Sequence, residues 1–186
     1  MDWVILDGFD RPSTAAEQIL ALLRDRLQQA AKRYEIFPLA KMNLASCRSC
    51  GACGYKSPGK CVVNDHLHGI LRAVAPSRVL VFLSPVRFGG YSYPLKKTTE
   101  KFMTLGMPYY SVPGGRLMHA LRYDAKSLLT IGVTEADVAG QEECFRLLSR
   151  RNANNLQSPH HRSVIVRPWD SVQAEVAPLL EEALPW

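Results

Sequence analysis

The feature that most constrains the fold is an alternation of short apolar runs with longer amphipathic stretches. Apolar runs of strand length occupy residues 3–6, 35–39, 78–83, 127–133 and 163–166. Stretches with helical periodicity occupy residues 14–33, 65–74, 94–103, 136–156 and 171–184. Strands that alternate with helices in this way form a parallel sheet covered on both faces. We therefore predict an α/β fold, a three-layer α/β/α sandwich around a five-stranded parallel sheet.

The run at 78–83 is continuous in apolar residues, which is typical of a central strand buried on both faces. A five-stranded sheet of this type commonly has the strand order 2-1-3-4-5. Its ligands bind beyond the carboxyl ends of the strands, between the first and third strands. Loops at 7–13 and 84–93 would flank that point, and a cysteine-rich segment follows the second strand. We expect these three segments to meet at one edge of the sheet.

The chain length and the charge pattern limit the classes of function. The 186 residues fit a single domain spanning 1–186, with a cysteine-rich insertion at 46–62. No apolar run has membrane length, and the N-terminus lacks the basic region of a signal peptide, so we expect a cytoplasmic protein without a membrane partner. The net charge is +6, but the basic residues are scattered among acids. This favours anionic small molecules or acidic partners over nucleic acid.

Four of the five cysteines, Cys47, Cys50, Cys53 and Cys61, lie in one short segment. In a reducing compartment such a group indicates metal binding or redox chemistry. Three thiolates with two-residue spacers, and a fourth from further along the chain, suit a four-iron, four-sulfur cluster. A zinc site could use the same residues, although the pair-plus-pair spacing of zinc ribbons is absent, and bare thiols or a disulfide are the third option. We expect the fifth cysteine, Cys144, to be a core residue of a helix.

The segment after the central strand carries a family resemblance. Its sequence, Ser-Pro-Val-Arg-Phe-Gly-Gly-Tyr-Ser followed by Pro-Leu-Lys, resembles the flavin loop of the flavodoxin-like FMN reductases. A planar flavin needs backbone amides and a close approach of the backbone, which proline and glycine allow. A plain Pro/Gly turn is the alternative. The resemblance implies a flavodoxin-like fold and FMN held by Ser84, Pro85, Val86, Arg87, Phe88, Gly89, Gly90 and Tyr91, with Arg87 as a candidate for stabilising reduced flavin.

The cysteine spacing resembles that of the iron-sulfur flavoproteins, which add a cluster to the same fold. This implies that Cys47, Cys50, Cys53 and Cys61 ligate a four-iron, four-sulfur cluster. Reductases of the same superfamily without a cluster carry a related run before an acidic residue. Here Gly59-Lys60-Cys61, followed by Asp65, is similar to that run. Both interpretations therefore stay open.

The N-terminal loop departs most from the family pattern. The resemblance assigns Arg11, Ser13 and Thr14 to the FMN phosphate, and Thr134, after the fourth strand, to a further flavin contact. The loop is shorter than the family's and carries Asp7 and Asp10. Their negative charges disfavour a phosphate at the helix N-terminus.

Taken with the resemblance, these features predict an FMN-dependent oxidoreductase with an iron-sulfur cluster. The first alternative is a metal-free NAD(P)H-dependent FMN or quinone reductase, and the second is a flavin-free redox sensor or binding module. The cofactor performs the chemistry, so no catalytic acid or base is expected. NAD(P)H, ferredoxin, a quinone and oxygen species are the electron donors or acceptors that would suit an exposed flavin edge. The resemblance also implies a homodimer or homotetramer.

Overall fold

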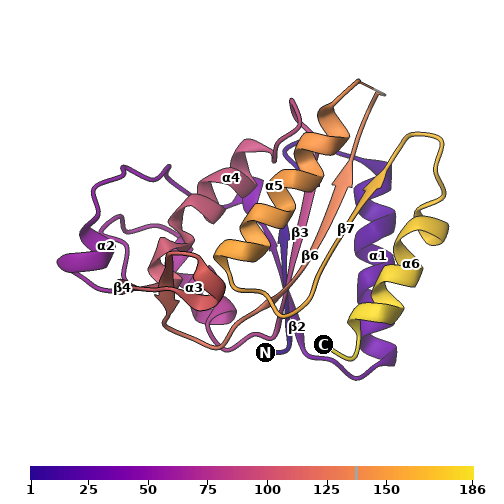
Figure 1. Ribbon diagram of the computed structural model, residues 1–186. Coiled ribbons are helices and arrows are strands. Elements are labelled where there is room, and N and C mark those ends of the chain that lie inside the picture. Colours follow the sequence, from indigo (N-terminus) through magenta and orange to yellow (C-terminus); the bar gives the residue numbers. More distant parts are fainter. Residues whose placement is uncertain (137) are drawn as a thin grey trace.

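A five-stranded parallel sheet forms the centre of the computed structural model, which describes residues 1–136 and 138–186 (Figure 1). Its strands are β1 (Trp3–Asp7), β2 (Tyr34–Pro38), β3 (Val79–Pro85), β6 (Ser127–Val133) and β7 (His161–Val166). Their order in the sheet is β2-β1-β3-β6-β7, and all neighbouring pairs are parallel. The predicted sheet and its 2-1-3-4-5 order are therefore confirmed.

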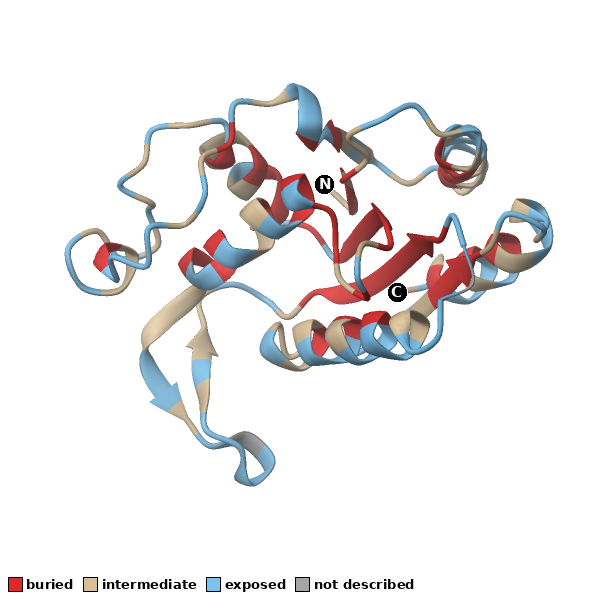
Figure 2. Cartoon of the chain, turned by 90° about the horizontal axis from the view of Figure 1, so that it is seen from above, coloured by how far each residue is buried: buried red, intermediate tan, exposed pale blue. Residues whose placement is uncertain are grey.

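Helices cover both faces of this sheet. On one face α1 (Thr14–Gln29) and α6 (Val172–Ala183) enclose a core that includes Trp3, Ile5 and Val81. On the other face α3 (Leu67–Val74), α4 (Tyr93–Glu100) and α5 (Gln141–Asn155) enclose a second core that includes Leu6 and Phe82. The central strands are the most deeply buried part of the molecule (Figure 2).

Two helix boundaries differ from the sequence prediction. Helix α1 begins at Thr14, as predicted, after the cap residue Ser13, whose hydroxyl accepts a hydrogen bond from the amide of Ala16. The helix ends at Gln29 because Ala31 adopts a positive φ of 52°. Helix α5 begins at Gln141 after Gly140, with φ 80°, and the predicted start at Ala136 precedes residue 137, which lies outside the described residues.

The segment at 104–124, between the predicted helix at 94–103 and the predicted strand at 127–133, contains a β-hairpin. After the 3-10 turn η2 (Lys101–Leu105), strands β4 (Gly106–Ser111) and β5 (Met118–Leu121) pair in antiparallel fashion around the short turn η3 (Pro113–Gly115). The hairpin projects from the helical layer (Figure 2). Its sequence gave only a weak signal because Pro108 interrupts the first strand and neither strand alternates cleanly between apolar and polar residues.

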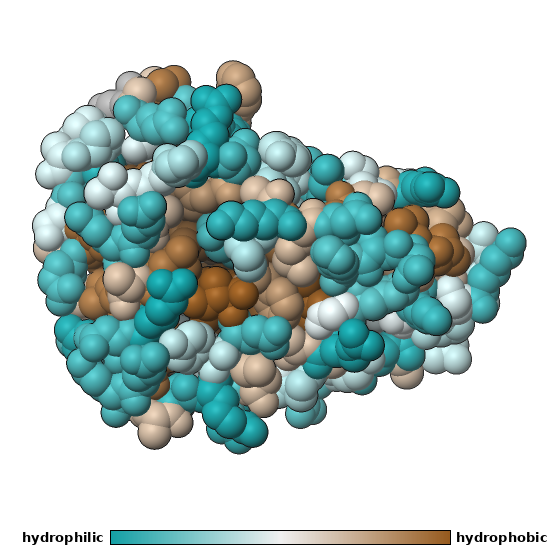
Figure 3. Space-filling view, turned by 180° about the vertical axis from the view of Figure 1, so that it is seen from behind, coloured by the Kyte–Doolittle hydropathy of each residue, from teal (hydrophilic) through white to brown (hydrophobic). Residues whose placement is uncertain are grey.

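The face seen in Figure 3 is mostly hydrophilic, with an apolar patch near its centre. Among the described residues, no helix combines the length and apolar character needed to cross a membrane.

Candidate functional site: a flavin-type loop and a cysteine pocket

The β3–α4 loop (residues 86–92) lies at the carboxyl end of the central strand and contains a tight, unusual turn. The amide and carbonyl groups of Arg87 and Gly90 exchange two hydrogen bonds of 2.8 and 3.0 Å. The two residues between them, Phe88 and Gly89, have φ values of 50° and 72°. Positive φ at both central positions defines a type I′ turn, where a phenylalanine is strained. Such strain persists where surrounding contacts impose it, and it often marks functional loops.

Two serines fix the ends of this loop. The hydroxyl of Ser84, fully buried, accepts a hydrogen bond from the amide of Ser92 at 2.9 Å and donates to the carbonyl of Pro85 at 2.8 Å. Ser92 in turn donates its hydroxyl proton to the carbonyl of Gly8. The amide of Gly8 donates to the carbonyl of Leu83 at 2.8 Å. The β1–α1 loop and the β3–α4 loop are thereby joined, as predicted for the two segments beside the sheet's switch point.

Gly8 and Gly89 are positions of close approach. A Cβ added at Gly8 would lie 2.7 Å from the Ser92 hydroxyl, and one at Gly89 would lie 2.6 Å from the Cβ of Cys144. The Gly89 amide also donates to the side-chain oxygen of Gln141 at 3.3 Å. The β3–α4 loop therefore packs directly on the start of α5. The prediction that Cys144 is a core residue is wrong, because its side chain is exposed beside this contact.

Tyr91 anchors the loop from below. Its ring packs edge-on against Phe82 and Phe145, at centroid distances of 5.8 and 5.4 Å. Its hydroxyl accepts a hydrogen bond from the side chain of Asn152 at 3.2 Å. Burial raises the pKa of Tyr91 to about 12, so the phenol stays protonated at neutral pH. Tyr91 thus supports the turn from the core, whereas Phe88 at its tip is 99% exposed.

Arg87 and Thr134 lie on the two sides of the same edge. The Arg87 guanidinium is 3.2 Å from the carboxylate of Glu135, which follows β6. The amide of Val86 donates to the carbonyl of Val133 at 2.8 Å, and this ties the loop to the end of β6. The hydroxyl of Thr134 is hydrogen-bonded to the carbonyl of Ala136. Arg87 is therefore an ion-paired residue of the loop itself, and Thr134 stabilises the β6–α5 connection.

The residues assigned to a phosphate have other surroundings. Ser13 is used as the cap of α1, while Arg11 and Thr14 are exposed to solvent. One carboxylate oxygen of Asp10 is buried and has no hydrogen-bond partner. Asp7 accepts a hydrogen bond from the amide of Phe9 at 3.0 Å. Burial raises the pKa of Asp7, against the opposing effects of that amide and of two nearby cations.

The site would accommodate the isoalloxazine ring of a flavin mononucleotide better than its phosphate. The ring end fits, because the β3–α4 loop presents a strained, preformed turn at the switch point of the sheet. The phosphate end does not fit, because the β1–α1 loop that would face a phosphate dianion carries Asp7 and Asp10, and one oxygen of Asp10 is buried without a hydrogen-bond partner.

The four clustered cysteines line one cavity of about 440 Å³. Its other walls are residues 48–51, the two residues that follow Cys61, and the end of α4 with η2. All four thiols are free, and the amide of Ser49 donates to the sulfur of Cys47 at 3.4 Å. Burial raises the pKa of Cys53, against the opposing effect of a hydrogen bond to its own backbone, and the other three thiols add to the rise.

The cysteine cavity is not at the flavin-type loop, so the predicted meeting of three segments is wrong for this one. The β3–α4 loop precedes α4, whereas the cavity is lined by Glu100, Lys101 and Met103 at the other end of that helix. Eight residues of helix separate the two ends by about 12 Å. After β2 the chain leaves the sheet, and the part of the cysteine segment around α2 (Ala52–Tyr55) projects beyond α4 and contacts η2 (Figure 1).

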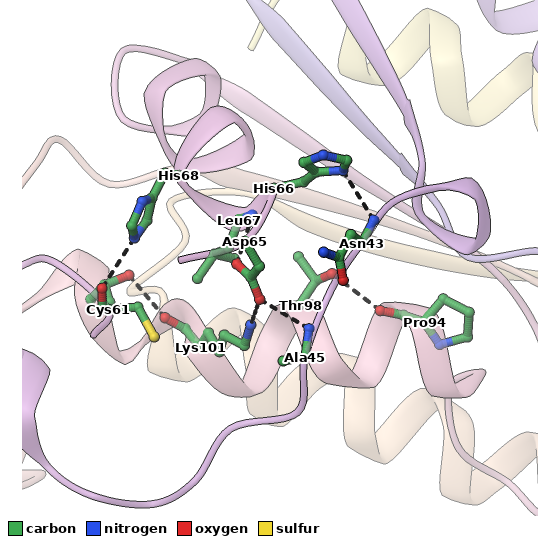
Figure 4. A network of polar contacts seen from close by, with 11 residues as sticks. Asn43, Ala45, Cys61, Asp65, His66, Leu67, His68, Pro94, Thr98 and Lys101 are labelled. Atoms are coloured by element: carbon green, nitrogen blue, oxygen red, sulfur yellow. Dashed lines mark hydrogen bonds and ion pairs between the residues drawn. The ribbon is translucent and has the colours of Figure 1, made fainter. Parts of the chain in front are cut away.

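A buried ion pair closes the base of the cysteine segment (Figure 4). Asp65 pairs with Lys101, and both side chains are almost fully buried. The same carboxylate accepts the amides of Ala45 and Leu67, at 2.9 and 3.0 Å, from the two ends of the segment. Burial by itself would raise the pKa of Asp65, but these hydrogen bonds and the Lys101 charge lower it below the usual value.

Within residues 1–136 and 138–186, no group of three or more His, Cys, Asp or Glu side chains is arranged to hold a metal ion. The thiols therefore share a cavity but do not converge on one point. This arrangement gives no support to a zinc site, which requires four ligands at about 2.0–2.3 Å from a single ion.

No family model and no curated protein match the sequence. Solved structures do match over the whole chain. An FMN-dependent NADH-azoreductase from Bacillus anthracis, in complex with FMN, has a TM-score of 0.70 at 13% identity, over 100% of this chain and 98% of that one. An NAD(P)H:quinone oxidoreductase from Methanothermobacter marburgensis has a TM-score of 0.71 at 15% identity, over 100% and 93%.

A flavodoxin variant from Pseudomonas aeruginosa also matches, with a TM-score of 0.58 at 15% identity over 100% of this chain and 97% of that one. At these identities the likeness shows the fold. The predicted flavodoxin-like architecture is confirmed, and the structural neighbours include FMN-dependent oxidoreductases.

Proposed function

We propose that this chain is a flavin-dependent oxidoreductase that accepts electrons from NAD(P)H and passes them to a small acceptor such as a quinone. The observation that carries the proposal is the type I′ turn at residues 87–90, at the switch point of a flavodoxin-like sheet. The B. anthracis and M. marburgensis neighbours, by their names, use FMN with NADH or reduce quinones. A bound flavin would supply the hydride and electron chemistry.

The chain's own residues would hold the ring rather than react with it. The amides of Arg87, Gly89 and Gly90 are hydrogen-bonded within the protein, so the Phe88 amide is the donor of the turn that would face the polar edge of the ring. The exposed Phe88 side chain would cover one face of the ring. Arg87 would place positive charge beside the ring, shared with Glu135. No general acid or base is assigned.

The test is a titration of the purified, flavin-free protein with riboflavin and FMN, followed by assays of NADPH and NADH oxidation with a quinone acceptor. We expect quenching of flavin fluorescence at a stoichiometry of one per chain and flavin-dependent NAD(P)H oxidation. Absence of binding by either flavin would reject the proposal and favour a flavin-free redox sensor or binding module on the same fold.

A second candidate adds a four-iron, four-sulfur cluster in the cysteine cavity, which would pass electrons singly to a partner such as ferredoxin. It is favoured by one observation, the placement of Cys47, Cys50, Cys53 and Cys61 around a single cavity of about 440 Å³. A cluster spans several ångströms, so its ligands surround a volume rather than a point. The thiols would have to move inward to bind it, since their present arrangement holds no ion.

Iron and sulfide analysis of anaerobically purified protein separates the two candidates. A cluster predicts about four irons per chain, lost in Cys50→Ala and kept in the matched control Cys144→Ala. Metal-free protein with a flavin spectrum would establish the first candidate alone. We also propose that the protein is a homodimer or homotetramer, which light scattering of the same samples would test.

A further inference from the structure

We infer that the flavin site selects against the 5′-phosphate, so that this chain binds riboflavin at least as tightly as FMN. The inference rests on the proposed flavin function and concerns the β1–α1 loop, residues 7–14. In the flavodoxin-like topology this loop lies beside the β3–α4 loop, to which Gly8 joins it through Leu83 and Ser92. A flavin ring on the one loop would therefore direct its ribityl chain toward the other.

The charges at this end of the site repel a phosphate. Asp7, Asp10 and Glu17 lie within the loop and the first turn of α1, and Arg11 is the one basic residue between them. Lys41 and Arg24 act on Asp7 from outside the loop. Arg11 is exposed and makes no ion pair with any residue that the structure describes. A phosphate monoester carries a charge of about −1.5 to −2 at pH 7. A second negative group close to a carboxylate is unfavourable, most of all where both are partly desolvated.

The hydrogen-bond donors that usually attract a phosphate are also partly used. Ser13 accepts the amide of Ala16 with its hydroxyl at 3.3 Å and the amide of Glu17 with its carbonyl at 3.0 Å. The α1 N-terminus is thus capped by the chain itself. The loop has little freedom to move away, because a Cβ at Gly8 would already lie within 3 Å of Ser92 and of Leu95.

The unpartnered oxygen of Asp10 points to the chemistry that would fit instead. A buried carboxylate oxygen without a hydrogen bond is costly, and it is satisfied by a neutral donor. The terminal hydroxyl of a ribityl chain is such a donor, whereas a phosphate oxygen is an acceptor. The same side chain that rejects FMN would therefore bind the alcohol of riboflavin.

Fluorescence titrations of the full-length protein with riboflavin and with FMN, at low and at high NaCl concentration, test the inference. We expect riboflavin to bind at least as tightly as FMN. Added salt should tighten FMN binding by screening the repulsion, and leave riboflavin unchanged. In Asp10→Ser the affinity for FMN should rise at least tenfold and that for riboflavin should fall. Asp25→Asn is the matched control, because it removes an exposed acid further along α1, and it should change neither affinity.

Tighter binding of FMN than of riboflavin by the wild-type protein would overturn the inference and leave the flavin function standing. Binding of neither flavin would overturn both. If circular dichroism shows that Asp10→Ser does not fold, the affinities of the wild-type protein for riboflavin and FMN, and their salt dependence, still test the inference.

Discussion

The β3–α4 loop and the cysteine segment are both loops with chemical character, but they are held in different ways. The β3–α4 loop is fixed along its whole length, by hydrogen bonds to Gly8, Val133 and Gln141 and by the Tyr91 ring below it. The cysteine segment, residues 46–64, is fixed at its base by Asp65, and its interior bonds are mostly short-range. A loop fixed throughout is shaped before a ligand arrives, whereas a loop fixed at its base is free to adjust around one.

The largest effect is expected from breaking the base of the cysteine segment. Asp65→Asn would leave the Lys101 ammonium buried without its counter-charge, which should lower the free energy of unfolding by about 3–5 kcal/mol. Urea denaturation measures this. The control is Glu100→Gln, which removes an exposed partner of Lys96 and should cost less than about 1 kcal/mol. Equal losses in the two variants would show that Asp65 does not close the segment.

The second-largest effect on stability is expected in the β3–α4 loop. Gly89→Ala places a Cβ 2.6 Å from that of Cys144 at a positive φ, so both crowding and backbone strain oppose it. We expect a loss of about 2–4 kcal/mol and at least a tenfold weaker affinity for flavin. Gly140→Ala shares the positive φ but has open space around its Cβ, so it should lose about 1–2 kcal/mol. Equal losses of stability in Gly89→Ala and Gly140→Ala would mean that the contact of the loop with α5 contributes nothing.

The free energy of unfolding contributed by Asp65 is also expected to depend on pH. The pKa of Asp65 is lowered in the folded protein, so its contribution to stability is present above the pKa of the unfolded chain. This contribution is lost as the pH falls through the lowered pKa of Asp65 in the folded protein. Each pKa unit by which folding lowers this pKa corresponds to about 1.4 kcal/mol of stability. The stability difference between wild type and Asp65→Asn should thus shrink in acid. A difference that is constant from pH 7 to pH 3 would contradict the assignment.

The smallest effect is a gain in stability. Phe88 is strained at φ 50° and almost fully exposed, so Phe88→Gly should relieve strain without losing buried area. We expect thermal unfolding to show stabilisation of under about 1 kcal/mol, with weaker flavin binding. Stronger flavin binding in this variant would show that the side chain does not cover the ring.

The sheet could be predicted from the sequence because its strands, such as residues 78–83, are buried on both faces and read as continuous apolar runs. The turn at Phe88 was predicted as a flavin loop from Pro85 and its glycines. The contacts that hold the site could not be predicted, since each joins residues distant in sequence. Ser92 with Gly8, and Asp65 with Lys101, are polar pairs without a local pattern.

The position of the cysteine segment was missed for a related reason. A segment that follows a strand starts at the carboxyl edge of the sheet, but it need not stay there. Here the segment leaves that edge, and Asp65 at its end pairs with Lys101, directly after the last residue of α4. Only a three-dimensional arrangement reveals such a departure.

The hydrogen bonds around Asp65 hold the two ends of the cysteine segment together, so the residues between them can be replaced as a unit. Asn43 and His66 are joined by two hydrogen bonds of 3.0 Å, and one carboxylate binds the amides of Ala45 and Leu67. The two ends of the segment therefore touch, and the entropy of closing a loop grows only slowly with its length. Segments of other lengths and compositions could therefore join these two ends without changing the sheet. The same fold could acquire or lose a redox group in this way while its β3–α4 loop stays unchanged.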